Sequence, residues 1–178
     1  MIEKAIKFAV KAHEGQKRKG TDIPYIMHPM EAATIAASIK YDPDLICAAL
    51  LHDTIEDAGV STDTLSSMFG DRVADLVHFQ SEDKTRSWQE RKQDTIDKLN
   101  NSTDEDAKIV CLSDKLANLR SISNDYQILG DSLWSRFNAE KEKQVWYYRG
   151  LCDALASLGK YIAYREFSNL VDAVFGDI

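Results

Sequence analysis

Apolar residues recur at spacings of three and four along most of the chain, and glycines and prolines interrupt the pattern. This periodicity is typical of helices that bury one face. It predicts helices with the approximate bounds 2–13, 29–39, 42–59, 64–69, 71–80, 87–99, 103–122, 139–158 and 161–175. No run of residues alternates between apolar and polar positions as a half-buried strand does, and no internal repeat occurs. The sequence therefore predicts an all-α fold.

The most apolar of these stretches reads DPDLICAALLHDTIEDAG and runs from Asp42 to Gly59. Asp and Pro suit the first turn of a helix, and Gly suits its end. Because apolar residues cover its first turns almost all round, we expect a helix buried at the centre of the domain. Its last turns carry four polar side chains at spacings of i,i+3 and i,i+4: His52, Asp53, Glu56 and Asp57.

These four side chains are the first candidates for chemistry. Three carboxylates near the carboxyl end of one helix repel one another and oppose the helix dipole, so we expect a cation beside them. Imidazole and carboxylate together suit a divalent transition metal. The residues alone leave a second interpretation open, namely a solvated acidic helix end with one hydrogen-bonded histidine.

Two further candidates belong to other predicted helices. His28 precedes Pro29 at a helix entrance, where it can cap the helix or act as a ligand. Asp114 comes after the apolar run IVCL, as Asp53 comes after a buried helix, and Asn118 is one turn later. An isolated helical aspartate is usually a surface residue or a cap, so Asp114 by itself does not predict a ligand.

Basic residues concentrate in the predicted loop 16–25, which carries three in succession: Lys17, Arg18 and Lys19. Such a run is usually a solvated loop. Its place between two candidate site elements nevertheless favours phosphate binding.

For two groups of residues in the second half of the chain, the sequence predicts structural roles. Charged residues of the helix 87–99, Lys92 among them, indicate a mixed solvated face. Three aromatic residues are adjacent in the sequence, namely Trp146, Tyr147 and Tyr148, so their side chains point in different directions. One of them is free to stack on a ligand, but for the group we expect a role in helix packing.

Composition limits the classes of protein to be considered. The 178 residues, 44% of them hydrophobic, suffice for one domain over 1–178. The 29 acidic and 22 basic residues give a net charge of -7, which disfavours nucleic acid as a partner. Three scattered cysteines indicate reduced thiols, and the start MIEKAIKFAV is too short and too charged for a membrane span or a secretion signal. We expect a cytoplasmic protein without a membrane partner.

Three ordered stretches resemble the hydrolase portion of RelA/SpoT-type alarmone enzymes, which is an HD domain, and particularly the small stand-alone SpoT-like hydrolases. They read AHEGQKRKGTDIPYIMHPMEAA, LLHDTIEDAG and CLSDKLANLRSI. The resemblance covers about residues 1–125, and WYYRGL is a weaker continuation. It implies an HD-domain helical bundle and a single HD-type phosphohydrolase domain over 1–178.

The resemblance also implies roles for particular residues. In such enzymes four side chains bind one divalent ion per chain, usually Mn²⁺, and the matching positions here are His28, His52, Asp53 and Asp114. The catalytic pair matches Glu56 and Asp57. The nucleotide contacts match Arg18, Lys19, Lys115 and Asn118.

The reaction that the resemblance implies is release of pyrophosphate from the ribose 3′ position of guanosine 3′,5′-bis(diphosphate), or ppGpp. No residues remain for a synthetase domain, so we expect hydrolysis without synthesis. Ala117 stands where the large enzymes commonly have a histidine, so details of their purine pocket do not transfer. Two alternatives stay open: an HD-type phosphohydrolase for a nucleoside phosphate or phosphorylated dinucleotide, and a non-catalytic nucleotide sensor. The complete set of metal and catalytic positions disfavours the sensor.

Overall fold

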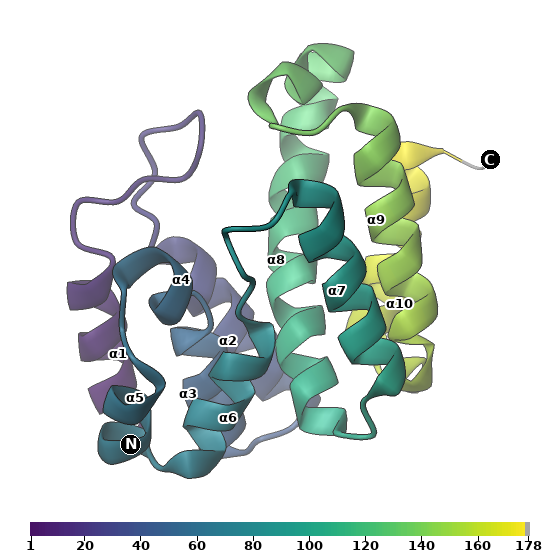
Figure 1. Cartoon of the computed structure of the whole chain (residues 1–178). Helices are drawn as coiled ribbons and strands as arrows, with labels where there is room; N and C mark the ends of the chain where they lie inside the picture. Colours follow the sequence, from purple (N-terminus) through teal and green to yellow (C-terminus); the bar gives the residue numbers. More distant parts are fainter. Residues whose placement is uncertain (177–178) are drawn as a thin grey trace.

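A computed structural model describes residues 1–176, which form helices and, within that range, no β-sheet (Figure 1). The all-α prediction is confirmed. The α-helices are α1 Ile2–Ala12, α2 Met27–Ile39, α3 Pro43–Leu51, α4 Thr54–Ala58, α5 Thr62–Phe69, α6 Asp71–Gln80, α7 Trp88–Asn101, α8 Glu105–Leu129, α9 Lys141–Ala154 and α10 Ile162–Phe175. Two 3-10 helices accompany them, η1 Gly130–Arg136 and η2 Ala156–Leu158. No helix in the described part of the chain is long and apolar enough to cross a membrane.

The long helix α8 runs through the middle of the molecule, between α1–α6 on one side and α7, α9 and α10 on the other (Figure 1). It packs against α2, α3 and α6 of the first group and against α10 of the second. Leu112, Leu116 and Leu119 of α8 are fully buried, and burial of one such side chain contributes about 1.5–3 kcal/mol. Helix α8 therefore joins the two groups, and Asp114 is a polar residue on its buried part.

The predicted helix 42–59 is wrong in one respect, because the structure divides it into α3 and α4 at His52 and Asp53. Asp42 caps α3 as predicted, and every residue from Leu45 to Leu51 is buried. Side chains then form hydrogen bonds with the last carbonyl groups of α3. His52 Nδ1 lies 2.8 Å from the Ala49 carbonyl oxygen, and Thr54 Oγ1 donates to the Leu51 oxygen at 2.7 Å. These local bonds compete with continuation of the helix.

This division reverses the electrostatic argument for the acidic residues after His52. Glu56 and Asp57 lie in the first turn of α4, where the helix dipole favours negative charge. The sequence had predicted them at the negative end of one long helix. The dipole therefore gives no reason for a cation at this point, and the case for a metal depends on the tertiary arrangement.

Most other helix bounds agree with the sequence to within a few residues. The capping box of Ser87 and Glu90 at the start of α7 is confirmed. Helix α8 begins after the cap Asp104 and continues to Leu129, beyond the predicted end at 122. The sequence also missed η1, and it predicted one helix over 139–158 where the structure has α9 followed by η2.

Candidate functional site

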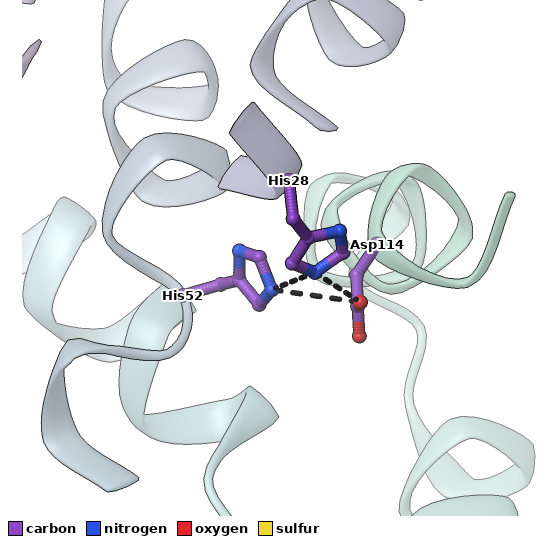
Figure 2. Close-up of side chains that lie close together, drawn as sticks. All are labelled: His28, His52 and Asp114. Carbon is purple, nitrogen blue, oxygen red and sulfur yellow. Dashed lines mark hydrogen bonds and ion pairs between the residues drawn. The ribbon is translucent and has the colours of Figure 1, made fainter. Parts of the chain in front are cut away.

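His28, His52 and Asp114 come from three separate elements and meet in the interior (Figure 2). His28 lies in the first turn of α2, His52 follows α3, and Asp114 belongs to α8. His28 Nε2 is 3.2 Å from His52 Nε2 and 3.1 Å from Asp114 Oδ1, and the distance from His52 Nε2 to that oxygen is 3.5 Å. All three residues are buried. We call them the His-His-Asp cluster.

Neighbouring groups orient the side chains of the cluster. His52 Nδ1 faces the Ala49 carbonyl oxygen, which only accepts hydrogen bonds, so Nδ1 carries a proton and Nε2 is the nitrogen directed toward the cluster. Asn118 Nδ2 donates to Asp114 Oδ1 at 2.7 Å, and Lys115 Nζ lies 2.6 Å from Asp114 Oδ2. Burial alone would raise the pKa of Asp114, but the charges of Lys115 and His52 hold it well below its usual range.

These atoms fit a divalent transition metal ion. Two imidazole nitrogens and a carboxylate oxygen converge, and all lie within 4.8 Å of one another. Imidazole and carboxylate are ligands that such ions accept together. The convergence is a property of the fold, because the three residues are brought together by α2, α3 and α8.

Asp53 lies beside the cluster, with a different environment from the other three predicted ligands. Its Oδ2 is 2.9 Å from His52 Nε2 and 3.6 Å from His28 Nε2. The same oxygen accepts a hydrogen bond from the Tyr25 hydroxyl at 2.6 Å. Burial would raise the pKa of Asp53, but the neighbouring His52 lowers it below the usual range. The structure thus brings all four predicted metal ligands together and adds Tyr25, which the sequence did not single out.

The carboxylates of Glu56 and Asp57 are held by the segment that follows α6. Glu56 Oε1 accepts the Glu82 backbone N–H at 2.7 Å, and Asp57 Oδ1 pairs with Lys84 Nζ at 2.7 Å. Burial raises the pKa of Glu56, while no hydrogen bond or ion pair among the described residues joins either carboxylate to the His-His-Asp cluster. Their predicted catalytic role stays a prediction.

A cavity of about 940 Å³ lies next to the cluster, and His28 is part of its wall. Its volume is in the range that accommodates a small-molecule ligand. All four predicted nucleotide contacts line it: Arg18, Lys19, Lys115 and Asn118. Arg18 Nη2 donates to Asn118 Oδ1 at 2.8 Å, so the basic loop is attached to α8 across the cavity. Lys17 instead pairs with Asp22 at the surface.

Several residues of the cavity wall were missed or misjudged from the sequence. Lys92 was predicted on a solvated face of its helix, but its side chain is only 17% exposed and lines the cavity. Its spacing to Ile96 and Leu99, both buried, was the signal that could have revealed this. Tyr147 and Tyr148 are buried and line the cavity, so both residues belong to the hydrophobic core and to the cavity wall. Ala117 is fully buried in the core.

Comparison with known proteins identifies the class to which this helical fold and cluster belong. The family described as HD domain matches residues 5–142. The chain is 35% identical over 146 residues to a guanosine-3′,5′-bis(diphosphate) 3′-pyrophosphohydrolase of Aquifex aeolicus, a match that takes in 81% of this chain and 19% of that relative. It is 36% identical over 126 residues to the guanosine-3′,5′-bis(diphosphate) 3′-pyrophosphohydrolase MESH1 of Danio rerio, covering 69% of each.

A solved structure extends the comparison to three dimensions. It is that of a metazoan ortholog of SpoT, described as hydrolysing ppGpp, with a TM-score of 0.76 and 27% identity over 98% of this chain and 93% of the other. The chain therefore belongs to the HD-domain family, in its SpoT-like group, as the resemblance predicted. Membership implies a divalent metal ion, for which the His-His-Asp cluster is a candidate site.

Proposed function

We propose that the protein is a metal-dependent phosphohydrolase that releases pyrophosphate from the 3′ position of ppGpp. The observation that carries the proposal is the position of the His-His-Asp cluster, which adjoins a cavity with a basic wall. His28 belongs to both, since its Nε2 faces Asp114 and its side chain lines the cavity. Arg18, Lys19 and Lys115 bring positive charge to that cavity in a protein whose net charge is -7. Local positive charge of this kind suits a multiply phosphorylated nucleotide.

We infer that the metal is one Mn²⁺ ion held by His28, His52 and Asp114, with Asp53 as the fourth ligand. A mixed set of imidazoles and carboxylates supports this assignment, because Mn²⁺ accepts both kinds of donor. When bound, such an ion lowers the pKa of a water molecule and polarises a phosphoryl oxygen. Tyr25 orients Asp53 through its hydroxyl, and the Ala49 carbonyl oxygen fixes the proton of His52 on Nδ1.

The remaining residues act on the substrate and the proton. Glu56 is suited to accept a proton from the attacking water, because burial raises the pKa of its carboxyl group. Asp57 is the second member of the proposed catalytic pair. Arg18 and Lys115 offset the charge of the phosphates, and Asn118 connects Arg18 to Asp114 through one amide group.

We also infer that residues 1–178 form one HD-type phosphohydrolase domain. The packing of α8 supports this, because it contacts α2 of the first helix group and α10 of the second. The cavity supports it as well, since Arg18 precedes α2 while Tyr147 belongs to α9. Both groups of helices are therefore needed to enclose the proposed substrate.

A panel of nucleotides incubated with the Mn²⁺-loaded protein tests the proposal. The panel contains ppGpp, a nucleoside triphosphate and a phosphorylated dinucleotide, with products resolved by chromatography. We expect GDP and pyrophosphate from ppGpp. Turnover of another member alone would reassign the substrate, and binding of ppGpp without turnover would identify a sensor. The Asp114→Ala protein is the control, since it keeps the cavity wall but lacks one proposed ligand.

A further inference from the structure

The segment 81–87 connects α6 of the first helix group to α7 of the second (Figure 1). Glu82, near the start of this segment, contacts both groups. Its backbone N–H donates to Glu56 Oε1 in α4 at 2.7 Å. Its side chain reaches α7, where it contacts Arg91, Lys92 and Thr95. One residue therefore connects the proposed proton acceptor to a helix that forms part of the cavity wall.

The carboxylate of Glu82 is anchored on α7 by two cations. Its Oε1 lies 2.6 Å from Lys92 Nζ, and its Oε2 accepts a hydrogen bond from Arg91 Nη1 at 2.9 Å. The side chain is only 9% exposed, so solvent screens these ion pairs little. Burial would raise the pKa of Glu82, but the charge of Lys92 holds it below its usual value, so the carboxyl group is ionised at neutral pH. Charge-assisted hydrogen bonds on both oxygens fix the direction of the side chain.

The Glu56 carboxylate depends on the same segment for its position. Within residues 1–176, the Glu82 N–H is the one hydrogen-bond donor that this carboxylate meets. Lys84 Nζ donates to the Glu56 carbonyl oxygen at 2.8 Å, so the segment also holds the backbone of α4. A general base must direct its oxygen at the proton that it accepts, and a displacement of about 1 Å can cost ~100-fold in rate. The placement of the Glu82 N–H therefore bears on turnover.

We propose that Glu82 is a positioning residue for Glu56, in which the carboxylate anchored on α7 holds the backbone N–H of the same residue against the Glu56 carboxylate. Glu82 acts through Glu56 and not on the substrate. This inference rests on the proposed function, because it requires Glu56 as the proton acceptor. The length of the Glu82 side chain sets the distance between α7 and the backbone at residue 82. Reach is therefore more important than charge.

Four variants separate reach, charge and a general loss of stability. Glu82→Ala removes the anchor. Glu82→Asp keeps the charge but shortens the side chain, whereas Glu82→Gln keeps the length without the charge. The matched control is Glu90→Ala, because Glu90 stabilises the start of the same helix through its capping box with Ser87. That change weakens α7 at a point where the partner is Ser87 rather than Glu56.

The first measurement is kcat of the Mn²⁺-loaded full chain at saturating ppGpp, with KM from the same curves. We expect Glu82→Ala to lower kcat by about tenfold or more and Glu82→Asp by about threefold or more. Glu82→Gln should retain more kcat than Glu82→Asp, and Glu90→Ala should stay within about twofold of the unmodified protein. Added to Glu56→Gln, Glu82→Ala should lower kcat by less than about twofold, because residues that act as a unit are not additive.

The second measurement is hydrogen exchange of the residue 82 amide by NMR, which requires no turnover. We expect Glu82→Ala to lower the protection of this amide by about tenfold, since the hydrogen bond to Glu56 opens more often when the segment is not anchored. Glu90→Ala should change its protection by less than about twofold.

Equal losses of kcat from Glu82→Ala with and without Glu56→Gln would overturn the proposal. So would a raised KM with kcat unchanged, or a higher kcat in Glu82→Asp than in Glu82→Gln. If Glu82→Ala does not fold, the order of the Asp and Gln variants decides. The proposed function fails separately, when the unmodified protein hydrolyses no ppGpp. Hydrogen exchange then still measures whether the Glu82 side chain holds the N–H bonded to Glu56, and unchanged protection would overturn that as well.

Discussion

The His-His-Asp cluster and the pair Glu56 and Asp57 share the sequence stretch LLHDTIEDAG, yet their surroundings differ. His52 is 2% exposed and lies among side chains from α2 and α8. Glu56 is half-buried and Asp57 is exposed, and their carboxylates are bound by the Glu82 backbone and by Lys84. The break between α3 and α4 separates the two environments.

The difference indicates how each group is positioned. The cluster is set by the packing of helices with fully buried leucines, so its geometry exists before any ligand binds. The pair is set by hydrogen bonds to residues after α6, which exchange more readily than packed side chains. We therefore expect changes in the cluster to affect metal binding and changes in the pair to affect turnover.

The largest effect is expected for His52→Ala, which should remove the metal ion and abolish hydrolysis. Asp114→Ala should do the same, because each change deletes a proposed ligand from a buried site. Metal analysis and an activity assay measure the outcome, and circular dichroism should show nearly unchanged helix content. His78→Ala is the control, since His78 is exposed on α6. Stoichiometric metal in either variant would remove that residue from the ligand set.

Glu56→Gln should retain the metal and the substrate affinity but lower kcat by at least ~100-fold, because the amide cannot accept the proton of water. The amide keeps the size of the side chain and can still accept the Glu82 N–H. Steady-state kinetics with metal analysis check this, with Glu14→Gln, an exposed position, as the control. Near-normal turnover would assign proton transfer to another group and weaken the contrast between the pair and the cluster.

Arg18→Ala should raise KM for ppGpp by roughly tenfold or more, since a charge-assisted contact contributes on the order of 1.5 to 3 kcal/mol. Metal content should not change, because Arg18 reaches the cluster only through Asn118. Lys17→Ala is the matched control in the same loop, as its partner is Asp22 at the surface. An unaltered KM for every nucleotide of the panel would make the loop a structural connection only.

The smallest effect is expected on stability. A chelator should lower the melting temperature by about 5–10 °C if the free ion had been present at ~100 times its dissociation constant, because the ion binds only the folded cluster. Differential scanning calorimetry measures the shift. The Asp114→Ala protein should show no such shift. An equal melting temperature with and without chelator in the unmodified protein would argue against one ion joining α2, α3 and α8.

The sequence by itself determined most of the helices, because their signals are local. Asp42 caps α3 through its own neighbours, and Ser87 with Glu90 forms a capping box within one turn of α7. The apolar run before His52 predicted the burial of α3, and three linked motifs identified the family. Each cap, apolar run and motif is a short continuous stretch of the chain, so the order of residues is enough to reveal it.

Tertiary structure decided what depends on distant residues. The break at His52 and Asp53 follows from side-chain bonds to the end of α3, which periodicity does not register. Tyr25 contacts Asp53 on another element, and the packing of α7 on α9 places Lys92 beside Tyr147 in the cavity wall. The distances within the His-His-Asp cluster arise in the same way, because only the packing of α8 brings Asp114 to the two histidines.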